Sequence, residues 1–222
     1  MSGARGANGF TLLELLLAVA LSLLLSLLAY AGLSLGIQGW AGADRQLRQN
    51  EERYLTHQLL RRLLESAELE RLRDLEGKLQ PAFLGSAEGL IYCGELVGLG
   101  EPGQRYWLQL VQEQQLVADG AQWRLLLRYR SFQDDQLLDW DLLQQSLLDE
   151  GQVEVLLEGL AKPLRFEYLE RRPDSEPRWL DEWREQADLP LLLRVSAPQA
   201  EPYALELTAA PQEGRHAIVR AR

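Results

Sequence analysis

The stretch that decides the fold of this chain is GFTLLELLLAVALSLLLSLLAY, which runs from Gly9 to Tyr30. It is almost entirely apolar, and no charged side chain occurs between Leu15 and Ala43, a run of 29 residues. A helix of about 20 apolar residues is long enough to cross the hydrocarbon core of a bilayer. The stretch therefore predicts a membrane-spanning helix near the N-terminus.

The residues that precede the apolar stretch indicate its orientation. Residues 1–9 contain Arg5 and no acidic side chain, and positive charge before a span favours a cytoplasmic N-terminus. A cleaved secretory signal would have a shorter apolar core, followed by a cleavage site of small residues. We therefore expect a single-pass protein whose N-terminus is cytoplasmic and whose remaining chain is exported.

A single carboxylate, that of Glu14, interrupts the start of the apolar stretch. A plain anchor has no use for it, because an acid at mid-bilayer costs about 2.5–3.5 kcal/mol on insertion scales. If the chain is cut after Gly9, Phe10 carries a positively charged N-terminus, and Glu14 lies at i+4 on the same helical face. Glu14 can then attract the free amine of a neighbouring chain, by roughly 4 kcal/mol at about 4 Å and an effective dielectric constant of about 20. The spacing predicts that Glu14 acts in assembly.

These residues resemble the leader of the type IV pilin and pseudopilin family: Gly9 at the cut, then Phe10, Thr11, Leu12 and Glu14, followed by the apolar helix. The resemblance implies that a prepilin peptidase cleaves after Gly9 and methylates Phe10. It also implies a subunit held in the bacterial inner membrane, with a periplasmic globular head, that enters a filament after assembly.

Composition limits the other classes of function. The net charge is −10 and the sequence pI is about 4.8, which disfavours nucleic acid as a partner because phosphate binding needs clustered cations. The single cysteine, Cys93, excludes an intramolecular disulfide, and we expect it to be packed in the core. The absence of a cysteine pair also disfavours a major pilin, by the same resemblance.

Gly32 to Gly36 reads GLSLG and matches the G-x-S-x-G nucleophile pattern of hydrolases. That chemistry needs a strand–turn–helix elbow with a histidine and an acid nearby. Here the serine lies in or beside the apolar helix, and the two histidines are His57 and His216. We therefore expect no enzymatic activity.

Metal and cofactor sites are also not expected. One cysteine and two distant histidines cannot form a closed zinc site. The best acidic cluster is Asp134, Asp135, Asp139 and Asp141, which lacks the glycine-centred loop of an EF-hand. We expect a solvated acidic rim, and calcium binding by this cluster stays open.

Helical spacing continues beyond the apolar stretch, from Asp44 to Glu76. Apolar residues recur there three, four or seven apart, namely Leu47, Tyr54, Leu55, Leu59, Leu63 and Ala67. Gly77 is a plausible end of this helix. We expect a leader at residues 1–9, a transmembrane or filament-core helix at 10–38, an amphipathic continuation of the helix at 39–77 and a periplasmic head at 78–222.

After Pro81 the periodicity changes to two, which is typical of strands. QWRLLLRYRSF, residues 122–132, places Trp123, Leu125, Leu127 and Tyr129 on one face. Further strands are predicted at LIYCGELV, RYWLQLV, VEVLLEGL, LRFEYLE, LLLRVS, YALELT and HAIVR, and a short helix at residues 136–148. The predicted fold class is α+β: a long N-terminal helix packed on antiparallel sheet, as in pilins.

The segment from Val155 to Ser196 resembles the J-type minor pseudopilins of type II secretion systems. The matching residues are Leu156 to Gly159, Phe166 to Leu169, Trp179 with Trp183, and Leu189-Pro190. The resemblance implies a tip complex with minor pseudopilins I, K and H, in contact with the major pseudopilin G, which supports export of folded proteins. Two alternatives remain: a minor pilin of a type IV pilus, and a membrane-anchored periplasmic enzyme or binding protein.

Overall fold

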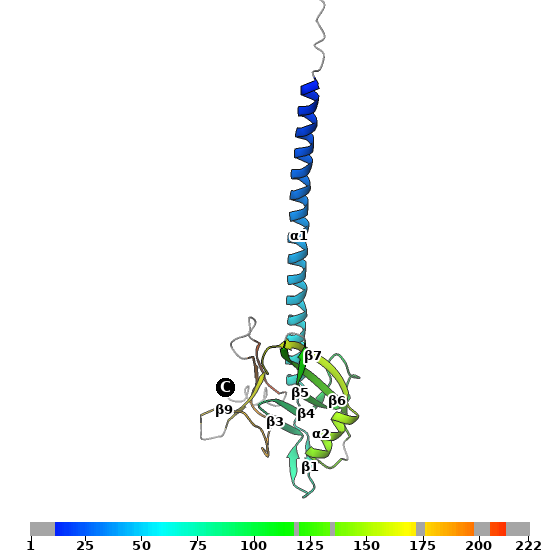
Figure 1. The fold of residues 1–222 in the computed structure, drawn as a ribbon. Helices are drawn as coiled ribbons and strands as arrows, with labels where there is room; N and C mark the ends of the chain where they lie inside the picture. Colours follow the sequence, from blue (N-terminus) through cyan, green and yellow to red (C-terminus); the bar gives the residue numbers. More distant parts are fainter. Residues whose placement is uncertain (1–11, 118–119, 134–135, 172–175, 198–204, 212–222) are drawn as a thin grey trace, which may run out of the picture. The chain divides into compact units, whose positions relative to one another are not determined.

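The computed structural model describes residues 12–117, 120–133, 136–171, 176–197 and 205–211. Within the first of these ranges, side chains are described for residues 12–31, 33 and 54–117. The chain divides into two compact units, Met1–Arg53 and Tyr54–Arg222. Figure 1 shows the elements of both units along the chain.

Helix α1 is continuous from Leu12 to Glu65. Its final turns belong to the second unit, where Leu60, Leu63 and Leu64 are fully buried in the core. The predicted apolar stripe is therefore only partly right, because Tyr54 and Leu55 are 62% and 60% exposed. The helix therefore enters the core near Leu60, later than the periodicity predicts.

The predicted end of this helix at Gly77 is wrong by twelve residues. After Glu65 the chain forms two short antiparallel strands, β1 (Arg71–Arg73) and β2 (Leu79–Pro81). Gly77 lies between them with φ +83°, and the Asp74 carboxylate accepts hydrogen bonds from the backbone N–H groups of Glu76 and Lys78. Such local bonds from an aspartate compete with helix formation, so the turn prevails.

A five-stranded antiparallel sheet forms the centre of the second unit, in the order β3-β4-β5-β6-β7. Its strands are β3 (Phe83–Ser86), β4 (Gly89–Glu95), β5 (Arg105–Val117), β6 (Gly120–Ser131) and β7 (Gln152–Leu160). The predicted buried face of β6 is confirmed at Leu125, Leu127 and Tyr129. Alternation therefore identified the side of this strand that faces the main core.

A second antiparallel sheet has the order β11-β10-β8-β9. Its strands are β8 (Arg165–Glu170), β9 (Arg178–Leu180), β10 (Leu193–Ser196) and β11 (Glu206–Ala209). Tyr168 joins the two sheets, because its hydroxyl is 2.9 Å from the Ser86 carbonyl and 3.0 Å from the Gly89 carbonyl. Burial raises the pKa of this hydroxyl far above its usual range.

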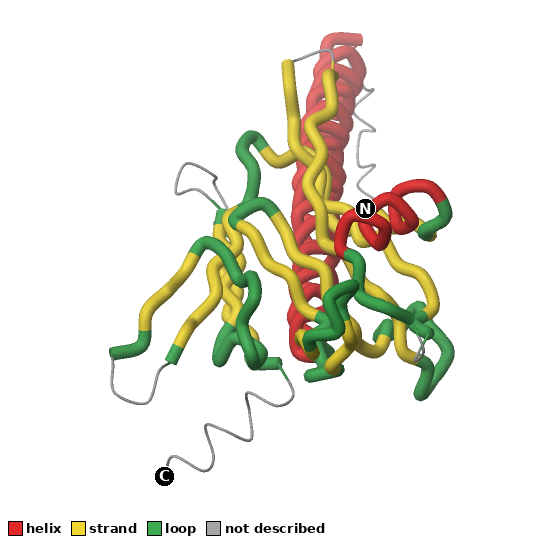
Figure 2. Tube along the Cα trace, turned by 90° about the horizontal axis from the view of Figure 1, so that it is seen from below, coloured by secondary structure: helices red, strands yellow, loops and turns green. Residues whose placement is uncertain are grey.

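Helix α2 (Trp140–Asp149) covers part of the other face of the five-stranded sheet, and it is seen from below in Figure 2. Leu143 and Leu147 are buried there in a second core cluster with Trp107 and Cys93. The helix starts four residues later than predicted because Asp139 caps it, accepting the Leu142 N–H at 3.0 Å.

The predicted α+β fold class is confirmed, with antiparallel pairing in both main sheets. The predicted strands fall on β4 to β8, β10 and β11, whereas HAIVR lies outside the described residues. The buried position expected for Cys93 is also confirmed.

Candidate functional site

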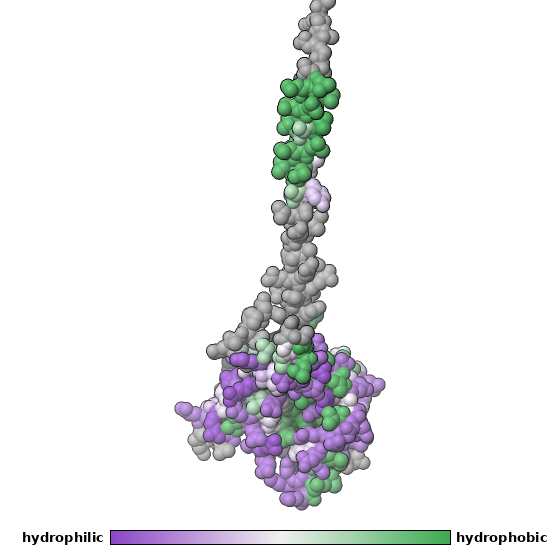
Figure 3. Space-filling view, in the orientation of Figure 1, coloured by the Kyte–Doolittle hydropathy of each residue, from purple (hydrophilic) through white to green (hydrophobic). Residues whose placement is uncertain are grey.

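The first half of α1 presents a long apolar surface. Leu12–Ala31 is long and apolar enough to cross a membrane by length and composition, and none of this segment is buried. Figure 3 shows it as a nearly continuous apolar surface, unlike the mixed surface of the second unit. Each leucine gains about 1.5–3 kcal/mol when it leaves water. The segment therefore favours an apolar surrounding, which a bilayer or a bundle of similar helices supplies.

The apolar side chains are not restricted to one side of this helix. Four residues within two turns, Leu16, Leu17, Val19 and Leu21, are each more than half exposed. A helix that packs on a soluble domain carries a single apolar stripe, whereas a helix that is apolar all round belongs in a membrane or a protein interior.

The serines of the segment suit the same surrounding. The Ser26 hydroxyl donates to the Ser22 carbonyl at 2.9 Å, so it needs no water to satisfy it. Both serines line a shallow groove on one side of the helix with Ala18 and Leu15. Small residues of this kind permit close approach of a second helix.

Glu14 lies in the first turn of α1 and is exposed. The backbone N–H groups of a first helical turn have no partner within the helix, and the helix dipole favours negative charge there. The carboxylate therefore suits this end of the helix, where it is the single charged group between Leu12 and Ala31. Gly9 and Phe10, the residues expected at the cut, lie outside the described residues.

The G-x-S-x-G pattern at Gly32 to Gly36 lies entirely within α1. A nucleophile elbow needs a sharp turn between a strand and a helix to expose its serine, and continuous helix does not provide one. Of the two histidines, His57 lies on α1 and His216 lies outside the described residues. The pattern therefore does not have the geometry of a hydrolase site.

Only two of the four aspartates in the acidic cluster lie within the described residues. Asp139 caps α2 and Asp141 lies in the first turn of that helix, whereas Asp134 and Asp135 lie outside the described residues. Within the described ranges, no group of three histidine, cysteine or acidic side chains could hold a metal ion.

The two tryptophans of the C-terminal motif have different surroundings. Trp183 is 5% exposed and its indole N–H donates to the Asp188 carbonyl at 3.0 Å, as expected of a core anchor. Trp179 is half-buried, and the guanidinium carbon of Arg194 lies 4.1 Å from its ring centroid. This arrangement is a cation–π contact at the sheet surface.

One polar cluster was not predicted from the sequence. On β5 and β6, Arg124 and Arg128 both bind the Glu113 carboxylate, at 2.8 and 2.5 Å. The alternation that places Leu125 and Leu127 on the core face also places both arginines together on the opposite face. Their shared partner depends on strand register, which the sequence alone did not supply.

Two comparisons with known proteins give a match and one gives none. A chain in the crystal structure of the GspK-GspI-GspJ complex from the enterotoxigenic Escherichia coli type 2 secretion system is similar in fold, with 17% identity and a TM-score of 0.42. The similarity covers 74% of the present chain and 95% of that chain. No curated protein sequence matches significantly. Residues 4–30, which include Gly9, Phe10 and Glu14, match the model of the prokaryotic N-terminal methylation motif, so the chain carries this motif at the start of its apolar helix.

Proposed function

We propose that this chain is a non-enzymatic minor pseudopilin of a type II protein secretion system. The observation that carries the proposal is the N-terminal methylation motif at residues 4–30. This motif overlaps the apolar segment Leu12–Ala31 of α1, whose apolar side chains are exposed on all sides. A prepilin peptidase would cleave after Gly9 and methylate Phe10. The exposed helix would first anchor the chain in the inner membrane, with the head in the periplasm, and would later pack in the filament.

Glu14 would act in the transfer from membrane to filament. Its carboxylate, in the first turn of α1, would pair with the amine of Phe10 in a neighbouring subunit. The attraction of roughly 4 kcal/mol at about 4 Å, before desolvation, is enough to select one longitudinal register between two helices. An ordinary membrane anchor gains nothing from this group.

The J type is the finer part of the proposal. It is supported by the motif resemblance of Val155 to Ser196, which includes Trp179 and Trp183. In this role the chain would form a tip complex with minor pseudopilins I, K and H, in contact with the major pseudopilin G. It would help start the filament that exports folded proteins.

The experiment that tests the proposal uses a strain that lacks the gene. Secreted proteins in the culture supernatant and pili on the cell surface are measured in parallel, with the full-length chain supplied on a plasmid as the control. A secretion pseudopilin predicts that exported proteins accumulate in the periplasm while pili remain. Loss of pili with unchanged secretion would instead identify a minor pilin.

The starting residue of the mature chain separates both filament roles from a simple tether. Mass spectrometry of the purified protein should find Phe10 as the N-terminus, with one added methyl group. A chain that still begins at Met1 would contradict a pilin or pseudopilin role and would favour a membrane-anchored enzyme or binding protein.

A further inference from the structure

One face of the five-stranded sheet is only partly covered by α2. Under α2 lie Cys93 and Trp107, which are paired across β4 and β5. The next row on this face crosses all five strands and consists of Leu84, Ile91, Gln109, Arg128 and Val153. Two further rows follow, Val111 with Leu126 and Val155, and then Glu113 with Arg124. We call these three rows the open face; within it Ile91 and Leu126 are buried, and Ile91 also belongs to the cluster under α2.

The edge of the open face at β7 is apolar and accessible to solvent. Val153 and Val155 are 48% and 45% exposed, although both carry branched apolar side chains that gain free energy on burial. Leu126, which pairs with Val155, is buried. A partner that covers these valines would therefore extend an existing apolar surface.

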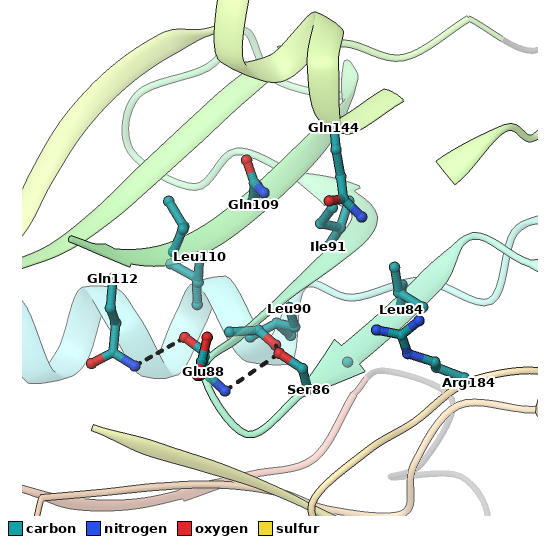
Figure 4. Close-up of a pocket in the computed structure, with 13 residues that line it drawn as sticks. Leu84, Ser86, Glu88, Leu90, Ile91, Gln109, Leu110, Gln112, Gln144 and Arg184 are labelled. Carbon is teal, nitrogen blue, oxygen red and sulfur yellow. Dashed lines mark hydrogen bonds between the residues drawn. The ribbon is translucent and has the colours of Figure 1, made fainter. Parts of the chain in front are cut away.

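At the opposite edge, the open face borders a cavity of about 240 Å³. Leu84, Ile91 and Gln109 of the sheet line it, together with Gln144 of α2 and Arg184, as Figure 4 shows. The side-chain oxygen of Gln109 is buried, and no hydrogen-bond donor reaches it within the described part of the chain. The open face thus has both a recess and an unmet acceptor.

The centre of the open face has an excess of positive charge, although the whole chain has a net charge of −10. Arg124 and Arg128 share the single carboxylate of Glu113. The Nε atoms of both arginines are buried without an acceptor among the described residues. Each guanidinium carries five N–H donors, so a single carboxylate cannot satisfy the donors of two arginines. This cluster suits an approaching acid.

Helix α2 shows which kind of element fits this surface. Leu143 and Leu147, four residues apart, pack in the cluster that contains Trp107. Glu150, directly after the helix, lies 3.7 Å from the guanidinium of Arg130, which pairs with Trp107 on the sheet. The covered part of the face therefore receives two helical leucines and one carboxylate. The open face repeats this combination of apolar side chains and arginines.

From these contacts we infer that the open face docks an acidic amphipathic helix of another subunit. Two large apolar side chains of that helix, four residues apart, cover Val153 and Val155. A carboxylate of the same helix binds Arg124 and Arg128, beside Glu113. The inference rests on the proposed function only in taking the partner from the same secretion assembly.

A matched pair of substitutions tests the sign of the partner's charge. Val155→Glu and Val155→Lys both place a long charged side chain at an exposed position, so both variants should fold. The full chains are produced together with the other pseudopilins and purified from membranes in detergent. Because like charges across an interface repel each other, we expect Val155→Glu to recover about tenfold less partner than Val155→Lys.

Leu116 provides the control for this pair. It lies on β5, faces the opposite side of the sheet and is 87% exposed. Leu116→Glu and Leu116→Lys should recover equal amounts of partner. Equal recovery with the two Val155 variants as well would overturn the inference.

Photo-crosslinking identifies the element that binds. With p-benzoylphenylalanine in place of Val153, irradiation should link the chain to another pseudopilin, and mass spectrometry should place the link within an acidic helical segment. A link to a strand, a link to a second copy of this chain or no link at all would overturn the inference. The proposed function has its own readouts, methylated Phe10 and restored secretion, so the two can fail separately.

Discussion

The hydroxyl of Tyr92 donates a 2.6 Å hydrogen bond to the backbone carbonyl of Leu63. Tyr92 lies on β4 and is fully buried, and Leu63 lies in the last turn of α1. The bond therefore joins the end of the long helix to the centre of the five-stranded sheet. It holds the helix at the point where the chain leaves it for β1.

Tyr92→Phe should lower the free energy of unfolding by about 1 kcal/mol. The cost is modest because the Leu63 carbonyl keeps the hydrogen bond from the Ser66 hydroxyl at 2.8 Å, while the ring still fills its site. The measurement is thermal or urea unfolding of the full chain in detergent. Tyr54→Phe is the control, since Tyr54 is 62% exposed and its substitution should change stability by less than about 0.5 kcal/mol. Equal effects at the two positions would contradict this role of Tyr92.

Stability should fall at alkaline pH because of buried tyrosines. Burial raises the pKa of Tyr92 and of Tyr168 well above the ordinary value, so the folded chain keeps both protons where the unfolded chain loses them. This stabilisation is complete below about pH 10 and is lost as the pH rises further, at about 1.4 kcal/mol per pH unit for each tyrosine. The measurement is the free energy of unfolding between pH 9 and pH 11, values chosen to lie about one unit on each side of the ordinary pKa.

The same experiment with Tyr168→Phe separates the two groups. The variant should be less stable at neutral pH. Above about pH 10 its free energy of unfolding should decline more slowly, by about 1.4 kcal/mol less per pH unit, because one tyrosine no longer contributes. An unchanged slope would show that the Tyr168 hydroxyl does not remain protonated in the folded chain.

Gly85→Ala should destabilise the contact between the two sheets. A Cβ atom at this position would lie 2.3 Å from the ring carbon that carries the Tyr168 hydroxyl. The ring cannot move aside easily, because it is buried and its hydroxyl is bonded to the carbonyls of Ser86 and Gly89. Overpacking of this kind costs about 1–3 kcal/mol, measured as a loss of unfolding free energy.

A double substitution shows whether Tyr168 is the cause. If the ring is responsible, Gly85→Ala should cost less in a Tyr168→Leu background than in the natural chain, because the two residues touch. Additive effects would mean that the loss of stability in Gly85→Ala does not come from a clash with the Tyr168 ring.

Alternation alone predicts a strand well where one of its faces packs in the main core and the other does not; β4, by contrast, is buried on both faces. The strand at residues 122–132 is an example, since Leu125 and Leu127 face the core as expected. The end of α1 could not be predicted in this way. Glu68 to Gly77 keeps helical composition, whereas the local bonds from the backbone N–H groups of Glu76 and Lys78 to the Asp74 carboxylate favour a turn.

The candidate sites also differ in how far the sequence alone predicts them. The role proposed for Glu14 follows from spacing along the chain, so the sequence was sufficient to propose it. The cluster of Arg124, Glu113 and Arg128 spans two strands, and its geometry follows from the register in which β5 and β6 pair. Cross-strand contacts of this kind require the structure.

Glu14→Gln and Glu14→Ala test whether the charge of Glu14 acts in assembly. Glutamine keeps the shape of the side chain and removes its charge, so a role in pairing with an amine predicts that both variants fail alike. Co-purification with the pseudopilins proposed as partners should fall about tenfold or more, since about 1.4 kcal/mol of lost interaction is a factor of ten. In the proposed function, cleavage after Gly9 and methylation of Phe10 would precede assembly, so both should continue in these variants. Glu14→Asp should retain part of the interaction, as the carboxylate remains in the first turn of α1. If Glu14→Gln assembled as well as the natural chain, the carboxylate would be a tolerated acid at the membrane surface, and the register of the helix would have to come from its apolar side chains.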